Sequence, residues 1–281
     1  MPFTTIISCG TLNKHLKDPN WAIIDCRFSL NDVEYGRREY YKGHIPGSAY
    51  AHLDEDLSSR VIPGQTGRHP LPEISKFARR LSNWGIGDNI QVIAYDDLGG
   101  GIAARLWWLL RWLGHDSVAL LDGGWQAWEQ GGYPTEIEVQ TLNSRKFTPR
   151  PRPELLVDAD QVLEINHASE YVVVDSRAAE RYRGEVEPID PVAGHIPGAV
   201  NAPFVQNLDA DNHFLDSAEL KARFERILGD RPAEKAVFYC GSGVTAAHNL
   251  VALMHAGLGE GLLYGGSWSE WITDSKRPVE K

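Results

Sequence analysis

The sequence predicts an α/β protein built from two tandem copies of one unit, each a mostly parallel sheet flanked by helices. Two observations carry this prediction. Four landmarks recur in the same order in both halves of the 281 residues, and in each half short apolar runs alternate with stretches of helical periodicity. The separation between matching landmarks changes little along the chain, so only short insertions distinguish the copies.

The four landmarks are a strand, a pentapeptide, a strand–loop–helix and an aromatic turn. The first is an apolar strand ending in Asp–X–Arg, in WAIIDCR and in YVVVDSR. The second is GHIPG, at 43–47 and at 194–198. The third pairs QVIAYDDLGGGIAARLWWLL with KAVFYCGSGVTAAHNLVALM, and the fourth pairs LLDGGWQAW with LLYGGSWSEW. Because Asp–X–Arg and GHIPG occur in both copies, we expect them to maintain the fold rather than perform the chemistry.

The apolar runs give the expected elements in order. Strands are predicted at 21–25, 91–95 and 118–121 in the first copy and at 171–175, 235–239 and 261–264 in the second. Helices are predicted at 102–113 and 244–255. Residues 141–156 contain three prolines and little apolar periodicity, which indicates an extended linker. The predicted domains are therefore residues 1–140 and 157–281.

Composition excludes several classes of function. A formal net charge of −10 argues against a nucleic-acid surface, which needs clustered Lys and Arg. No apolar run approaches the length of a membrane span, and the first residues do not resemble a signal sequence, so we expect a cytoplasmic protein that contacts no membrane. Cys9, Cys26 and Cys240 are scattered and form no CxxC motif, which predicts reduced thiols and no cysteine metal site. No other metal site and no organic cofactor is expected.

Cys240 marks the predicted active site. An apolar strand ends there, the small residues of CGSGVT turn, and an apolar helix begins. Backbone N–H groups of such a turn can surround the sulfur, and a helix N-terminus adds its positive dipole end. Both favour the thiolate, which is the nucleophilic form of cysteine. A buried structural cysteine is the alternative reading. In the first copy Asp96 replaces the cysteine, so that copy is predicted to be catalytically inactive.

Together these motifs resemble the tandem rhodanese-domain sulfurtransferases over essentially the whole chain, with an inactive first domain and a catalytic second one. CGSGVT is similar to the loop of the 3-mercaptopyruvate group, whereas the thiosulfate group carries two basic residues where Gly241 and Ser242 stand. The resemblance implies transfer of a sulfane sulfur from a small-molecule donor, 3-mercaptopyruvate, through a persulfide on Cys240. The acceptor it implies is a thiol, such as thioredoxin or a smaller thiol, or cyanide.

The resemblance also implies roles for individual residues. Cys240 would be the nucleophile, and a proton relay would consist of Ser242, His69 in GRHPLP and Asp54 in AYAHLDEDLS. Arg181 would bind the substrate carboxylate. The remaining substrate-binding positions are the loop residues Gly241, Gly243, Val244 and Thr245. A second arginine of the family aligns with Ile189 and is missing here, and Arg183 is a nearby alternative.

Other functions remain open on the sequence alone. The alternatives are a thiosulfate:cyanide sulfurtransferase and a noncatalytic module that carries persulfide or senses sulfur. A cysteine phosphatase or arsenate reductase would need a longer loop ending in an arginine that grips the oxyanion. Ala246 and Ala247 follow Thr245 here, which argues strongly against that class. Comparison of turnover on the two sulfur donors discriminates the remaining functions.

Overall fold

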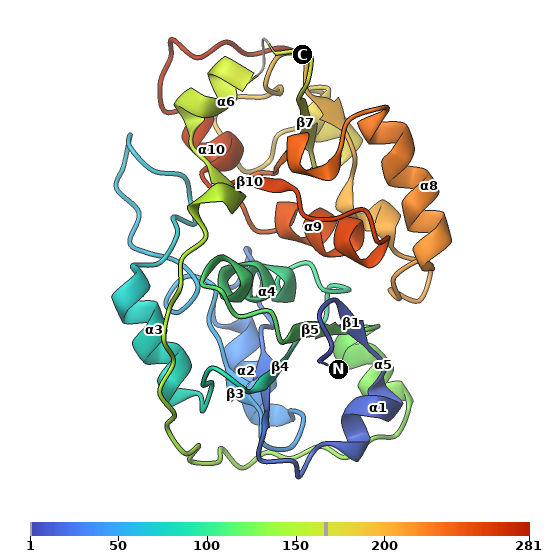
Figure 1. Cartoon of the computed structure of the whole chain (residues 1–281). Helices are drawn as coiled ribbons and strands as arrows, with labels where there is room; N and C mark the ends of the chain where they lie inside the picture. The colour runs from blue at the N-terminus through green and yellow to red at the C-terminus, as the bar shows by residue number, and fades with distance from the viewer. Residues whose placement is uncertain (1, 166–167) are drawn as a thin grey trace. The chain divides into compact units, whose positions relative to one another are not determined.

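The structure, a computed structural model, describes residues 2–165 and 168–281 (Figure 1). It contains two compact units. Unit 1 comprises the residues up to Ser59, Pro72–Arg152 and Ala210–Phe214, and unit 2 comprises Arg60–Leu71, Pro153–Asp209 and Leu215–Lys281. Each unit thus consists mainly of one sequence copy and includes one short segment from the other.

Each unit holds one five-stranded sheet in which all neighbouring strands are parallel. The strand order is β1-β5-β4-β2-β3 in unit 1 and β6-β10-β9-β7-β8 in unit 2. The two orders match strand for strand, which confirms both the α/β class and the duplication. Parallel strands end at a common edge of the sheet, where ligand sites of such folds usually lie. The cysteine loop follows β9, a central strand, and therefore starts at this edge.

The elements of unit 1 alternate strand and helix along most of the chain. They are β1 (Ile6–Ile7), α1 (Cys9–Lys14), β2 (Trp21–Asp25), α2 (Tyr35–Lys42), β3 (Ala49–Tyr50), α3 (Ile74–Asn83), β4 (Gln91–Tyr95), α4 (Ala103–Trp112), β5 (Val118–Leu121) and α5 (Gly124–Gln130).

Unit 2 repeats this pattern and adds three short 3₁₀ turns. Its elements are η1 (Pro153–Leu155), β6 (Leu156–Val157), α6 (Ala159–Ile165), β7 (Val172–Asp175), α7 (Ala179–Tyr182), β8 (Val200–Asn201), η2 (Phe204–Asn207), α8 (Ser217–Leu228), η3 (Ala233–Lys235), β9 (Ala236–Tyr239), α9 (Ala246–His255), β10 (Leu262–Tyr264) and α10 (Ser267–Trp271).

The predicted strands are confirmed to within one residue, as β2, β4 and β5 in unit 1 and β7, β9 and β10 in unit 2. Helix α4 packs on β4 and β5, and α9 packs on β9 and β10 (Figure 1). Every residue of α4 is buried, as expected for a helix that is apolar on more than one face. Helix α9 begins at Ala246, two residues later than predicted, because the preceding residues still bend around the Cys240 sulfur. None of the helices in the described residues is long and apolar enough to cross a membrane.

The segment between the copies is extended but anchored. The backbone N–H of Arg145 donates to Ser82 O at 2.9 Å, and that of Arg150 donates to Leu113 O at 2.8 Å. Phe147 is buried between these two anchors. Up to Arg152 this segment belongs to unit 1, so its prolines accompany a chain that is held along the surface of that unit.

A buried ion pair joins the repeated landmarks of unit 1. Arg27 Nη2 donates to Asp25 Oδ2 at 2.6 Å and to Gly43 O, in GHIPG, at 2.7 Å. The Tyr95 hydroxyl donates to Asp25 Oδ2 at 2.8 Å. The Arg27 guanidinium carbon lies 4.4 Å from the centre of the Trp125 ring, within range of a cation–π contact. One residue of each landmark therefore contacts this pair.

The same arrangement recurs in unit 2. Arg177 Nη2 donates to Asp175 Oδ2 at 2.6 Å and to Gly194 O at 2.7 Å. Its guanidinium carbon lies 4.9 Å from the Trp268 ring centre and 6.0 Å from that of Tyr239. Because Tyr239 is the last residue of β9, this pair fixes the strand end that precedes the cysteine loop.

Replacing Arg27 with Met should destabilise unit 1 by about 3–5 kcal/mol, because Asp25 would remain buried without its partner. Urea unfolding followed by circular dichroism measures the change. The matched control is Arg38→Met, which removes an exposed arginine paired with Asp32 and should not change the free energy of unfolding measurably. Equal effects of the two substitutions would contradict the structural role of the buried pair.

Candidate functional site

The cysteine loop, residues 240–245, connects the end of β9 to the start of α9. The first residues of α10 hold its carbonyl groups. Trp268 N–H donates to Cys240 O at 3.0 Å, and Ser269 N–H donates to Gly241 O at 2.9 Å. With these carbonyls bound by α10, the N–H groups of the loop are left to face the sulfur.

Ser267 supports the same end of the loop with its side chain. Its hydroxyl accepts a hydrogen bond from Cys240 N–H at 3.1 Å and donates to Tyr264 O at 2.9 Å. Its backbone has φ 55°, a left-handed conformation that is uncommon for residues other than glycine. The two hydrogen bonds compensate for this conformation, so Ser267 is a structural support of the active loop.

The Cys240 sulfur is buried and surrounded by donors. Gly243 N–H donates to Sγ at 3.2 Å. Burial alone would raise the pKa of the thiol, but hydrogen bonds outweigh it and lower the pKa below its ordinary value. The donors responsible are the Thr245 hydroxyl and the backbone N–H groups of Ser242, Val244 and Ala246.

The other two cysteines lack such donors. Burial raises the pKa of Cys9 to about 11, with Asp122 adding to the effect. Burial also raises the pKa of Cys26 well above its usual value, and nearby carboxylates, with Asp25 first among them, raise it further. Cys240 is therefore the one thiol of the three whose surroundings favour the thiolate.

One loop position requires glycine, and a second lies against the ends of two arginine side chains. Gly243 has φ +75°, and a Cβ there would run into Gly265 O. At Gly241 a Cβ would lie 2.8 Å from Arg68 Nη2 and 3.6 Å from Arg181 Nη1. The first glycine permits the turn around the sulfur, and the second lets two guanidinium groups approach the loop backbone.

Ser242 and His69 lie together, as the sequence analysis expects. Ser242 Oγ is 2.7 Å from His69 Nδ1, and both residues are buried. His69 comes from the segment Arg60–Leu71, which belongs to unit 2. Arg68 N–H donates to Ser269 Oγ at 3.0 Å, which ties this segment to α10 next to the cysteine loop.

Arg181, in α7, is held by two carboxylates. Its Nε and Nη2 donate to the Glu187 carboxylate at 3.2 and 2.7 Å, and Nη2 donates to Asp190 Oδ2 at 3.2 Å. Both Nη atoms lie 3.6–3.7 Å from the position that a Cβ at Gly241 would take. The Arg181 guanidinium therefore lies beside the backbone of the residue after Cys240, and its role in carboxylate binding stays a prediction.

Two further positions bear on carboxylate binding. Arg183 is exposed and forms a bidentate ion pair with Glu185. Ile189 is 42% exposed, and its backbone N–H donates to Glu187 Oε1. Position 189 thus carries no guanidinium, and the guanidinium of Arg183 is bound by Glu185.

In unit 1 the place of the cysteine is taken by Asp96, and its carboxylate is enclosed by backbone donors. Burial raises the pKa of this carboxyl, and four N–H groups at 2.7–2.8 Å oppose the rise. These donors belong to Leu98, Gly100, Ile102 and Ala103. The first loop thus surrounds the carboxyl group of Asp96, whereas the second surrounds the sulfur of Cys240.

Asp54 belongs to unit 1 and is exposed. Its backbone N–H donates to His52 Nδ1 at 3.2 Å. Its role in the proton relay stays a prediction.

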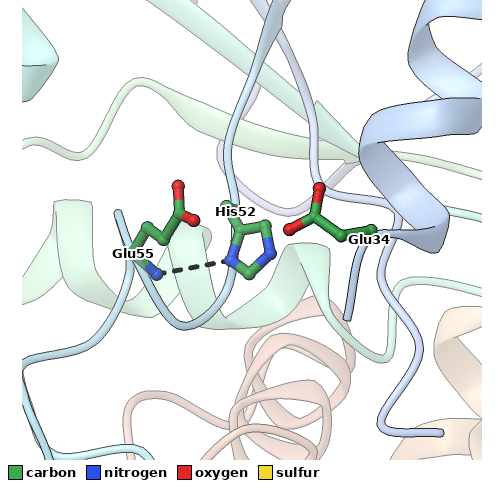
Figure 2. Close-up of side chains that lie close together, drawn as sticks. All are labelled: Glu34, His52 and Glu55. Atoms are coloured by element: carbon green, nitrogen blue, oxygen red, sulfur yellow. Dashed lines mark hydrogen bonds between the residues drawn. The ribbon is translucent and has the colours of Figure 1, made fainter. Parts of the chain in front are cut away.

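Unit 1 also contains a group with the residue types of a metal site. Ligand atoms of Glu34, His52 and Glu55 lie within 4.8 Å of one another (Figure 2). The protein itself satisfies them: His52 Nδ1 accepts the Glu55 N–H, His52 Nε2 lies 2.9 Å from Val33 O, and Arg37 pairs with both carboxylates. Because the histidine and both acids have partners, this group is explained as a structural cluster.

The sequence does not reveal the residues that contact the cysteine loop from other segments. Arg68, Asp190 and Glu187 form a charged cluster beside Gly241, and Ser267 supports the loop from behind. One signal was available for Arg68, which directly precedes His69 in GRHPLP. The repetition of the GG(S)W landmark pointed to α10 but not to its contacts with the cysteine loop.

The thiolate of Cys240 should form at a lower pH than that of an ordinary thiol, whose pKa is about 8.5. Titration of the ultraviolet absorbance of thiolate should show one such group, and the Cys240→Ala variant should lack it. Thr245→Val removes a hydroxyl hydrogen bond that favours the thiolate, so it should shift this titration to higher pH. A titration unaffected by Cys240→Ala would contradict the assignment.

Comparison with known proteins agrees with this architecture. The family described as "Rhodanese-like domain" matches residues 8–131 and 158–274. A protein of Pseudomonas aeruginosa named "Probable 3-mercaptopyruvate sulfurtransferase" is 48% identical over 99% of this chain and 99% of its own length. An Arabidopsis thaliana protein named for both thiosulfate and 3-mercaptopyruvate is 32% identical over 98% of this chain and 86% of its own. The structure of 3-mercaptopyruvate sulfurtransferase from Leishmania major superposes with a TM-score of 0.86 at 29% identity, covering 98% of this chain and 76% of that one. The chain therefore belongs to the rhodanese family and contains two rhodanese-like domains.

Proposed function

We propose that this protein is a sulfurtransferase that moves a sulfane sulfur from 3-mercaptopyruvate to a thiol or cyanide acceptor. The observation that carries the proposal is a cysteine whose surroundings favour the thiolate, in a loop whose Ser242 hydroxyl lies 2.7 Å from His69. The names of the relatives from Pseudomonas aeruginosa and Leishmania major support the donor.

In the first half of the reaction the Cys240 thiolate attacks the sulfur of 3-mercaptopyruvate. A sulfur–sulfur bond forms and the carbon–sulfur bond breaks, with its electron pair moving into the enolate of pyruvate. The cysteine becomes a persulfide. Backbone N–H groups of Ser242, Gly243, Val244 and Ala246 stabilise the negative charge on sulfur, because they already point toward it.

The enolate needs a proton at carbon to leave as pyruvate. Ser242 donates it, and His69 replaces the proton on the hydroxyl through Nδ1. Asp54 would hold the imidazole in the orientation for this transfer, a role that rests on the family resemblance. Arg181 binds the carboxylate of the donor beside Gly241 through Nη1, because Nε and Nη2 are bound by Glu187 and Asp190.

In the second half an acceptor thiolate attacks the outer sulfur of the persulfide, which releases Cys240 as a thiolate. Thioredoxin, another small thiol and cyanide all have the required nucleophile. We place this exchange in the cytoplasm, where thiols are kept reduced.

Thiosulfate is the second candidate donor, and one observation favours it. The loop itself carries no cation, but Arg68 and Arg181 both approach Gly241 from outside the loop. Two guanidinium groups can bind a dianion as well as a carboxylate. The Arabidopsis relative named for both donors is consistent with this alternative.

Wild-type protein should release pyruvate from 3-mercaptopyruvate faster than it releases sulfite from thiosulfate, and Cys240→Ser should abolish both activities because no persulfide can form. Coupled pyruvate and sulfite assays measure the two rates. Turnover by Cys240→Ser would contradict the mechanism. Faster turnover of thiosulfate by the wild type would mean that thiosulfate is the donor. The assignment of Cys240 as the nucleophile would be unaffected.

Ser242→Ala should lower kcat for 3-mercaptopyruvate by about 10²–10⁴-fold, the usual contribution of a general acid. Thiosulfate turnover should fall much less, because sulfite leaves without needing a proton on carbon. Both rates are measured on the same preparation, so a folding defect would reduce them together. Equal losses would argue against a proton relay through Ser242.

A further inference from the structure

Arg68 lies next to the cysteine loop, although it is remote from the loop in the sequence. Its backbone N–H is bound by Ser269 Oγ, whose own backbone N–H holds the carbonyl of Gly241. The guanidinium extends to the same glycine, where Nη2 would lie 2.8 Å from a Cβ. Main chain and side chain of Arg68 therefore both lie beside the backbone of the residue after Cys240.

Arg68 and Arg181 are held side by side by a shared carboxylate. Arg68 Nη1 pairs with Asp190 Oδ1, and Arg181 Nη2 donates to Asp190 Oδ2. Glu187 binds the rest of the outer edge of Arg181. Two guanidinium groups would otherwise repel each other, so the buried Asp190 is what permits them to converge on one place.

Both guanidinium groups keep donors that the protein does not use. Among the described residues Arg68 Nε is buried without a hydrogen-bond partner. Arg68 Nη2 and both Nη atoms of Arg181 are the groups nearest Gly241, and of these Arg181 Nη2 is already bound by Glu187 and Asp190. Buried N–H donors without partners are costly, which favours a bound acceptor at this place. A planar carboxylate is the acceptor that matches two neighbouring guanidinium edges.

We propose that Arg68 is a substrate-binding residue that, together with Arg181, binds the carboxylate of the sulfur donor at Gly241. This inference rests on the proposed function. Arg68 thereby supplies a second guanidinium from the segment that also carries His69, whereas Ile189 has none and that of Arg183 is bound by Glu185. One segment thus carries both a substrate anchor and a member of the proton relay.

The test uses two donors that differ only in the carboxylate: 3-mercaptopyruvate and 1-mercaptopropan-2-one, which has the same thiol and ketone. Arg68→Ala should raise KM for 3-mercaptopyruvate by about ten- to hundredfold, as for loss of a hydrogen bond to a charged group, with little change in kcat. With the neutral donor, kcat/KM should stay close to that of the wild type. Arg68→Lys should recover part of the affinity, because it retains the charge but not the planar fork.

Arg183→Ala is the matched control, since it removes an exposed arginine that is also paired with a carboxylate. It should change neither donor's kinetics. The thiolate titration of Cys240 should be the same in Arg68→Ala as in the wild type, which checks that the loop is intact.

An unchanged KM for 3-mercaptopyruvate in Arg68→Ala, or equal losses on both donors, would overturn the role of Arg68 in carboxylate binding. A wild-type protein that released no pyruvate would instead overturn the proposed function, and with it the donor named for Arg68. The two failures are distinguishable, because the second is seen before any arginine is changed.

Discussion

The buried Asp–X–Arg ion pair is the interaction on which the rest of each unit depends. The guanidinium binds the aspartate of its own strand end, the first glycine carbonyl of GHIPG and the face of a tryptophan from the aromatic turn. Such a pair is expensive to bury and is tolerated only when its remaining donors are satisfied. This requirement explains why four short motifs, distant in sequence, recur as a set: each contacts the same pair.

In unit 2 this constraint extends to the chemistry through the backbone. The ion pair lies against Tyr239 and Trp268, and Trp268 N–H in turn holds the carbonyl of Cys240. The orientation of the loop amides is thereby set by residues that do not touch the sulfur. The pKa of Cys240 is lowered by donors whose direction is fixed before any substrate arrives.

Features that depend on the local sequence pattern, such as strand positions, could be predicted from the sequence. Continuous apolar runs located the central strands within one residue, and the small residues after β9 located Cys240. The closeness of His69 and Ser242 rested on resemblance, because 173 positions separate them and local periodicity carries no information about such contacts. The place of Arg68 is hidden for a related reason: the loop sequence contains no cation, and nothing in it indicates that one approaches from the Arg60–Leu71 segment. The start of α9 was misplaced because helical periodicity does not report which amides turn toward a side chain.

The Asp96 loop of unit 1 can be compared with the cysteine loop of unit 2, which follows the equivalent strand. The loop of unit 1 folds around a carboxyl group that accepts four backbone N–H groups. In the proposed cycle the second loop faces the thiolate and then the persulfide anion, which differ in length by one sulfur but carry the same charge. The charge moves by one bond, from Sγ in the thiolate to the outer sulfur in the persulfide, whereas the amides that point to Sγ belong to the loop backbone. The duplicated loop is best described as a fixed anion receptor, which one copy fills with its own side chain and the other uses to carry sulfur.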